Sequence, residues 1–332
     1  MVQNFWYLVI ISAIMAVYNL SAEEILRDND RVAFIGNTFV ERAQSYGHIE
    51  SHILVASEAK NLVFRNLGWS GDSVFNDARS YFGPPSEGRE RLGKAISEMR
   101  PNVVMICYGT GAAMSINQQW TNEQNAVTSV IGAGLESDLD VFISGYRQLI
   151  DNIRNSAGKD LREIILITPP PLENLGPPLP DQVENNKNLA AFSKAIVKLA
   201  RENNYKTIDL FSAIGHSGEV AEPALTENGI HYGDAGYQMI ANHIITGLKL
   251  PAERIAKSDY SKFTQLRSEI VEKNRLFFHR WRPANETYLF LFRKHEQGNN
   301  AKEIPMFDPL IKEREATINE IRTKIQNPSK PA

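Results

Sequence analysis

The sequence predicts an α/β domain in which helices cover both faces of a parallel five-stranded sheet, a three-layer α/β/α arrangement. Three observations carry this prediction. Short apolar runs recur along the first 250 residues, several of them are closed by glycine or a polar turn, and a helical pattern separates each run from the next. Such alternation indicates βαβ units, whose strands are parallel and buried on both faces.

The first predicted strand is the apolar run 32–35, which ends at Gly36 before Asn37 and Thr38 form a turn. A run this short, stopped by glycine, is typical of a buried strand of a parallel sheet. In open α/β sheets, ligands bind beyond the carboxyl ends of the strands, so Asn37 and Thr38 lie where a site is expected. The alternative is that one of them only caps the following helix. The remaining predicted strands are 62–67, 103–108, 163–168 and 205–210.

Helical periodicity fills the segments between these strands. The predicted helices are 41–58, 87–99, 138–155, 183–203 and 234–248. From residue 251 the pattern changes to long helices, which we call the C-terminal extension (residues 251–332). It contains an aromatic and basic stretch, and we expect Phe277, Phe278 and Trp281 to be largely buried against the main domain. The alternative is that these rings and the nearby arginines stack on a sugar.

Composition excludes several classes of function. The chain has 332 residues, 42% of them hydrophobic, and a net charge of −3, which is ordinary for a globular protein and gives no reason to expect nucleic acid as a partner. Its one cysteine excludes an intrachain disulfide framework and a cysteine-based zinc site. His48 and His52 are four residues apart, but no metal-binding pattern frames them, and we expect a solvated or capping role. No complete dinucleotide or phosphate-binding loop is present. The sequence therefore predicts neither a metal nor a cofactor.

Residues 1–22 are predicted to be a secretory signal peptide. Their apolar run, 5–17, is too short to span a bilayer comfortably, and small residues precede Glu23. No basic residue comes before the run, so an uncleaved N-terminal anchor is the alternative. Both place the protein outside the cytoplasm, secreted or periplasmic, and no second apolar segment is long enough to span a membrane. The remaining chain divides into a main domain, 23–250, and the C-terminal extension.

Four segments at predicted strand ends resemble the conserved blocks of the SGNH (GDSL-like) hydrolases over about residues 31–248. Their order along the chain and their placement after strands carry the resemblance, which implies a flavodoxin-like SGNH fold. The Gly-Asn-Thr form of the first block and the C-terminal extension resemble a secreted bacterial branch of this family. The four segments are Gly36-Asn37-Thr38, Ser70-Gly71-Asp72, Gly109-Thr110-Gly111 and Asn228-Gly229-Ile230-His231.

The resemblance implies a role for each of these positions. Thr38 stands at the nucleophile and His231 at the general base, with Asn228 or its neighbour Glu227 orienting the histidine. An oxyanion would be held at three positions, which are Thr38, Gly71 and Gly111. The predicted substrate contacts are Asn37 and Asp72, which lie in the first two blocks, and Tyr108, which precedes the third.

Three positions depart from the family pattern, and each departure weakens catalysis. Thr38 replaces serine, and its β-branch crowds the attacked carbonyl. Asn228 replaces the aspartate whose charge would stabilise an imidazolium. Gly111 replaces an asparagine whose amide would complete the oxyanion hole, a loss that typically costs about a hundred- to thousandfold in rate.

Two functions remain open from the sequence. The first is an ester hydrolase that acts on acyl or acetyl esters, with a small-molecule or carbohydrate ester as substrate. The second is an inactive SGNH-fold protein that binds a ligand without turnover, because fold alone does not settle function. The sequence sets neither the substrate nor the oligomeric state.

Overall fold

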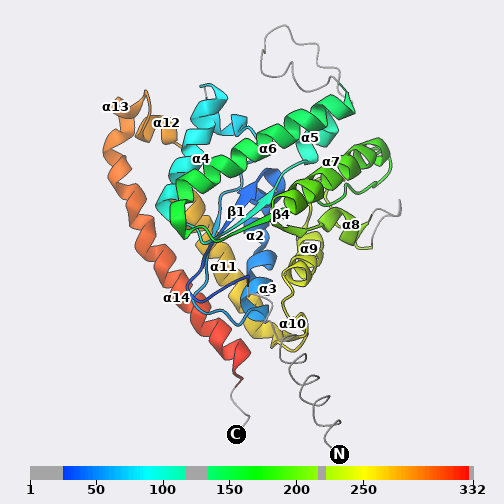
Figure 1. Ribbon diagram of the computed structural model, residues 1–332. Coiled ribbons are helices and arrows are strands. Elements are labelled where there is room, and N and C mark those ends of the chain that lie inside the picture. Colours follow the sequence, from blue (N-terminus) through cyan, green and yellow to red (C-terminus); the bar gives the residue numbers. More distant parts are fainter. Residues whose placement is uncertain (1–24, 82, 117–133, 216–221, 329–332) are drawn as a thin grey trace, which may run out of the picture.

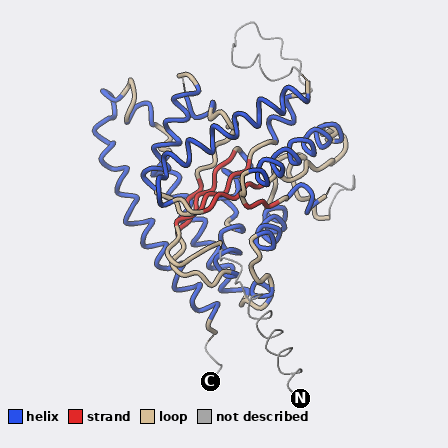
Figure 2. The backbone as a smooth tube through the Cα atoms, viewed as in Figure 1, coloured by secondary structure: helices blue, strands red, loops and turns tan. Residues whose placement is uncertain are grey.

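One parallel sheet forms the centre of the protein. The computed structural model describes residues 25–81, 83–116, 134–215 and 222–328. The strand order is β2-β1-β3-β4-β5, and every pair of neighbours is parallel. Figures 1 and 2 show this sheet enclosed between helices, so the predicted three-layer α/β/α fold is confirmed. The strands are β1 Arg31–Gly36, β2 Val63–Asn66, β3 Val103–Cys107, β4 Glu163–Ile167 and β5 Lys206–Ile208.

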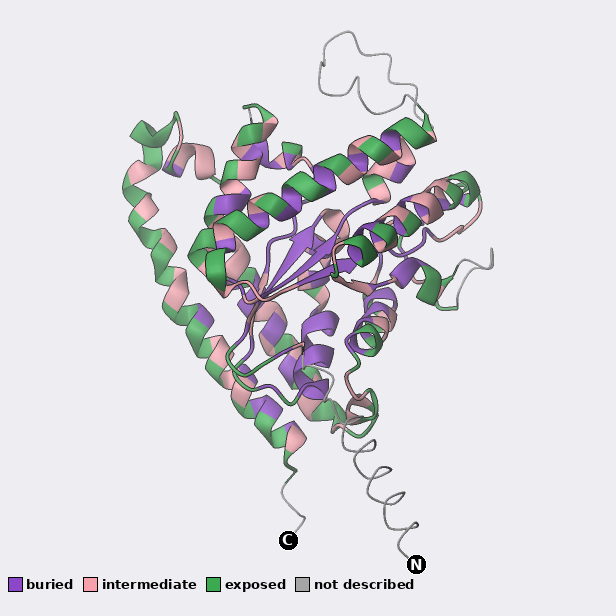
Figure 3. Cartoon of the chain, in the orientation of Figure 1, coloured by how far each residue is buried: buried purple, intermediate pink, exposed green. Residues whose placement is uncertain are grey.

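The side chains of β1 alternate between two hydrophobic cores, one on each face of the sheet. Val32 and Phe34 belong to one core, and Ala33 and Ile35 belong to the other. Successive residues of a strand point to opposite faces, so a strand that is apolar at every position must be covered on both. Figure 3 shows the strands buried and the outer sides of the helices exposed. One face is covered by α4 Pro85–Met99, α6 Leu135–Ala157 and α7 Val183–Glu202, and the other by α2 Thr38–Tyr46, α3 His48–Ala56 and α9 Asp234–Gly247.

Short helical segments occupy several connections, and one of them shortens the fifth strand. The strand predicted at 205–210 ends at Ile208, because the side chain of Asp209 accepts a hydrogen bond from the Ser212 amide and caps a helix there. These segments are η1 Asp77–Ser80, α5 Thr110–Ser115, η3 Gly158–Asp160, α8 Leu210–Ile214 and α10 Glu253–Ala256.

The single helix predicted over 41–58 is two helices, α2 and α3. Gly47 separates them with a φ of 69°, a left-handed conformation that glycine adopts without a steric penalty. The solvated role predicted for His48 and His52 is also wrong, since both are buried. The reason is that α3 packs against α9 and against helices of the C-terminal extension, so all of its residues are buried.

The C-terminal extension packs along the main domain. Its two long helices lie against each other, and α11 also contacts α2, α3 and β2. The Arg322 guanidinium is buried and donates to the carbonyl oxygens of Leu54, Ser57 and Ala59. The helical extension is therefore present as predicted and shares the core of the main domain. After α10, its elements are α11 Tyr260–Trp281, α12 Glu286–Leu289, α13 Lys294–Gln297, η4 Gly298–Met306 and α14 Phe307–Gln326.

Three aromatic rings near the end of α11 were predicted to pack against the main domain. Phe277, Phe278 and Trp281 are all half-buried. Phe277 and Trp281 pack against the core of the main domain, and the guanidinium of Arg65 lies 5.0 Å from the Phe277 ring centroid. These rings therefore join the extension to the main domain without being enclosed by it.

The predicted signal peptide, residues 1–22, lies outside the part of the chain that the structure describes. Within the described residues, no helix combines the length and the apolar character needed to cross a bilayer.

Candidate active site

Thr38 lies at the carboxyl end of β1, at the first position of α2. Asn37 caps this helix, and its side-chain oxygen accepts a hydrogen bond from the Phe39 amide at 3.2 Å. Gly36 is required just before the cap, because a Cβ there would lie 2.4 Å from the Cys107 carbonyl oxygen. The capping role considered for Asn37 is thus real, and it sets the position of Thr38 at the sheet edge.

The loop after β2 brings Gly71 to Thr38. We call residues 67–72 the Gly71 loop. The amide of Trp69 donates to the Gly36 carbonyl at 2.9 Å, which extends the pairing of the two strands beyond the sheet. The Gly71 amide then donates to the Thr38 Oγ1 at 3.1 Å, with Gly71 in a left-handed conformation at a φ of 77°. A hydroxyl and a backbone donor therefore meet at one point.

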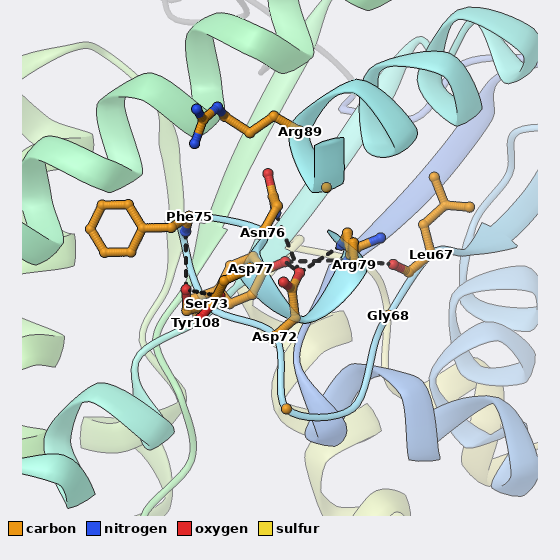
Figure 4. A network of polar contacts seen from close by, with 12 residues as sticks. Leu67, Gly68, Asp72, Ser73, Phe75, Asn76, Asp77, Arg79, Arg89 and Tyr108 are labelled. Carbon is orange, nitrogen blue, oxygen red and sulfur yellow. Dashed lines mark hydrogen bonds and ion pairs between the residues drawn. The ribbon is translucent and has the colours of Figure 1, made fainter. Parts of the chain in front are cut away.

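Asp72 and Tyr108 hold this loop from inside the protein. Figure 4 shows the Asp72 carboxylate and Arg79 pointing toward each other. Asp72 Oδ2 accepts from Arg79 Nε at 2.6 Å and from the Tyr108 hydroxyl at 2.6 Å, and Arg79 Nη2 donates to the Leu67 carbonyl oxygen at 2.9 Å. Burial raises the pKa of Asp72, and the positive charge of Arg79 opposes that shift. Asp72 and Tyr108, two of the three predicted substrate contacts, therefore support the loop and also line the cavity described next.

A cavity of about 340 Å³ opens beside this point. Asn37, Gly71 and Gly111 are among its lining residues. Gly111 lies in α5, and no other described group comes within 4 Å of where its Cβ would be. The position of the missing asparagine therefore has room for a side chain. One wall of the cavity is apolar, and is formed by Val74, Phe75, Val141, Phe142 and Phe192, while its polar lining includes Ser73, Asp77, Ser115 and Asp138.

His231 is oriented by Asn228, and the direction of their hydrogen bond can be assigned. The Asn228 Oδ1 accepts from the amides of Ile230 and His231, at 3.2 and 2.9 Å. Its Nδ2 therefore faces His231 Nδ1, at 3.2 Å, and donates to that nitrogen. A neutral imidazole that accepts at Nδ1 carries its proton on Nε2. The outer nitrogen of His231 thus presents a proton instead of the lone pair that a general base needs.

Glu227, the other residue considered for orienting His231, faces α2 instead. Its carboxylate accepts from Arg42 Nη2 at 2.7 Å and from the Tyr46 hydroxyl at 3.1 Å. Within the described chain, Thr38 and His231 share no hydrogen bond. The structure therefore joins Thr38 to Gly71, and Asn228 to His231, as two separate pairs.

Sequence reasoning missed the charged residues that surround these pairs. Glu41 and Arg42 follow Thr38 by three and four residues on a helix, a spacing that puts them on the same helix face. That spacing was a usable signal. Arg282 had no comparable local signal, because its partner Glu41 is 241 residues away in the sequence, whereas Arg79 follows its partner Asp72 by seven residues.

The pKa of His231 gives a first prediction. Burial and the nearby Arg42 charge lower this pKa from 6.5, and Glu227 opposes them. Arg42→Met removes a positive charge and leaves Glu227 unpaired, so we expect the pKa of His231 to rise. NMR titration of the imidazole measures it, with Arg147→Met, at an exposed pair with Glu202, as the control. An unchanged or lower pKa in Arg42→Met would contradict this account.

Comparison with known proteins agrees with the motif order. The sequence model of the GDSL-like Lipase/Acylhydrolase family matches residues 36–239. The GDSL esterase/lipase WDL1 of Oryza sativa subsp. japonica is 22% identical over 214 residues, which is 59% of this chain and 76% of that protein.

Solved structures with this fold include a gut microbial diltiazem-metabolizing enzyme. The two structures align over 90% of this chain and 96% of the enzyme, with a TM-score of 0.64 and 10% sequence identity. Axe2, an acetylxylan esterase from Geobacillus stearothermophilus, covers 68% of this chain and 97% of its own at a TM-score of 0.48 and 16% identity. Because the family match spans more than half of its length, the chain belongs to the GDSL-like lipase/acylhydrolase family.

Proposed function

We propose that the protein is an SGNH-type ester hydrolase with a degenerate catalytic set. The observation that carries the proposal is the hydrogen bond from the Gly71 amide to Thr38 Oγ1, beside a cavity of about 340 Å³ that Gly71 lines. A nucleophile needs a hydroxyl close to a donor that can hold an oxyanion, and this pair supplies both. The substrate class we propose is acyl or acetyl esters, including those of carbohydrates.

The proposed reaction uses the other tautomer of His231, with its proton on Nδ1, so that Nε2 takes the proton of the Thr38 hydroxyl as this attacks the ester carbonyl. The carbonyl oxygen becomes an oxyanion held by the amides of Thr38 and Gly71. His231 then returns the proton to the departing alcohol, and water releases the acyl group from Thr38 by the same steps. The apolar wall of the cavity suits the acyl group, and the polar lining of Ser73, Asp77, Ser115 and Asp138 suits a hydroxylated alcohol.

The second candidate is a protein that binds a ligand in this cavity without turnover. The hydrogen bond that Asn228 donates to His231 Nδ1 specifically favours it, since it stabilises the tautomer that cannot accept a proton from Thr38. We rank it second because Thr38, Gly71 and His231 are all retained, and because catalytic hydrogen bonds often tighten only once substrate is bound.

Thr38→Ala and His231→Ala test the proposal. We expect both to abolish hydrolysis of p-nitrophenyl acetate and acetylated sugars, and to similar extents, because nucleophile and base act as one unit. Tyr46→Phe, which removes only the hydroxyl bonded to Glu227, is the control. The second candidate would be established if calorimetry showed that the wild-type protein binds these esters and the assay showed that it hydrolyses none of them.

The proposal extends to localisation and organisation. We propose that 1–22 is a signal peptide, that 23–250 is the hydrolase domain, and that the protein belongs to the secreted bacterial branch with Gly-Asn-Thr in its first block. N-terminal sequencing of the exported protein tests the signal peptide, and a mature chain that begins at Met1 would favour the uncleaved anchor.

A further inference from the structure

Glu41 joins three parts of the protein beside Thr38. It lies on α2, one turn after Thr38, and its side chain is mostly buried. Its carboxylate accepts from the amide and the hydroxyl of Ser70, both at 2.8 Å. It also accepts from Arg282 Nη1 at 2.5 Å. One carboxylate therefore connects α2, the Gly71 loop and the C-terminal extension.

Arg282 also contacts the Gly71 loop directly. Its guanidinium carbon lies 3.6 Å from the centroid of the Trp69 ring, within the range of a cation–π interaction. The neighbouring Trp281 meets the same ring edge-on at a centroid distance of 5.8 Å. The loop backbone is pressed against α2 here, because a Cβ on Gly68 would lie 2.3 Å from the Glu41 amide. The end of α11 thus packs onto the loop residues just before Gly71.

Apart from the hydrogen bond of its amide to Thr38 Oγ1, Gly71 has little around it to fix its orientation. Within the described residues, nothing lies within 4 Å of where its Cβ would be. The direction of its amide is therefore set by its two neighbours. Asp72 is held from inside by Arg79, and Ser70 is held from outside by Glu41. Because Gly111 supplies no side-chain donor, the Gly71 amide is a larger share of the available oxyanion stabilisation.

We propose that Arg282, a residue of the C-terminal extension, is a positioning residue for the active site. It orients the Gly71 amide through Glu41, Ser70 and Trp69. The effect on turnover rests on the proposed hydrolase function, whereas the effect on the loop does not. The extension thereby supports the site, because the main domain alone would lack the Arg282 charge on Glu41 and the cation–π contact on Trp69.

Arg282→Ala, compared with Arg280→Ala, tests this role. Arg280 is a matched control, because it lies two residues earlier in the last turn of α11, is similarly buried, and pairs with Asp308 at 2.9 Å within the extension. Hydrogen–deuterium exchange of the Gly71 loop is the first readout. We expect about ten- to hundredfold faster exchange in Arg282→Ala, because a lost charge-assisted hydrogen bond raises local opening by that order, and unchanged exchange in Arg280→Ala.

Ester turnover is the second readout. We expect kcat to fall by about ten- to a hundredfold in Arg282→Ala with KM unchanged, because small displacements of a catalytic group have effects of that size. Arg282→Lys retains the charge and is expected to recover part of both readouts, which also guards against a folding defect in the alanine variant.

The outcomes separate the two proposals. Unchanged loop exchange in folded Arg282→Ala, or equal acceleration in Arg280→Ala, would overturn the positioning role whatever the activity. If the wild type hydrolyses no ester on the panel, the hydrolase function fails, and faster exchange in Arg282→Ala alone still supports the role of Arg282 in holding the loop.

Discussion

Asn228→Asp, combined with Thr38→Ser and Gly111→Asn, is expected to raise ester turnover by up to about ten-thousandfold. This is the order of effect that the opposite Asp-to-Asn change has in a serine protease triad. The aspartate would accept the backbone amides with one oxygen and the His231 Nδ1 proton with the other. The histidine would then present a lone pair at Nε2. The new asparagine has room, since Gly111 opens into the cavity.

Two measurements test whether these substitutions restore the active site. The first is kcat/KM on p-nitrophenyl acetate for the single Asn228→Asp variant and for the triple variant. The second is the ¹⁵N chemical shift of the His231 ring, which reports the nitrogen that carries the proton. Asn242→Asp, which adds the same charge at an exposed position of α9, is the control. If the ring proton is already on Nδ1 in the wild type, the structural account of Asn228 is wrong.

The same experiment bears on the choice between the two candidate functions. A wild type without activity and a triple variant with activity would identify a hydrolase fold that has lost its chemistry. Turnover by the wild type, lost in Thr38→Ala, would show that the degenerate set still works. If neither protein is active, binding without turnover becomes the better description of the cavity.

Lys273→Ala is expected to reduce the free energy of unfolding by about 3–5 kcal/mol, the usual cost of breaking a buried ion pair from one side. Lys273 Nζ lies 2.6 and 2.8 Å from the two carboxylate oxygens of Glu50, and also donates to the Phe64 carbonyl at 3.3 Å. Both side chains are more than nine-tenths buried. The substitution leaves the Glu50 carboxylate buried without a partner and loosens the extension from α3.

Urea denaturation of the variant measures this loss. Burial raises the pKa of Glu50, and Lys273 opposes that shift, so Glu50 takes up a proton more readily once the lysine is gone. We therefore expect the loss of stability to be larger at pH 8 than at pH 5. Glu50→Leu combined with Lys273→Met removes both charges and is expected to unfold near the wild-type midpoint. A small loss in Lys273→Ala, similar to that of exposed Lys324→Ala, would show that this pair does not hold the extension.

The sequence determined the sheet and the order of the site blocks. Apolar runs that stop at glycine predict buried strands, and all five were found at the predicted places. Since parallel strands end at one edge, Thr38, Gly71, Gly111 and His231 were expected to converge there. The structure joins Thr38 to Gly71 by a hydrogen bond and places Gly71 and Gly111 on one cavity. These features follow from local periodicity and from single residues such as Gly36, where any residue with a Cβ would clash with its neighbours.

Only the tertiary structure decided how the site is supported. Asp72 is turned inward to Arg79, Glu227 is bound to Arg42, and Arg282 reaches Glu41 across 241 residues of sequence. Likewise, the tautomer of His231 depends on which backbone amides face the Asn228 oxygen. Local propensity does not encode the Glu227 and Arg282 contacts, because they form only after distant elements have packed. The Asp72–Arg79 pair lies within seven residues, but Tyr108, 36 residues away, completes it. The backbone framework of the site is therefore readable from the sequence, whereas its hydrogen bonding and charge are set by packing between remote segments.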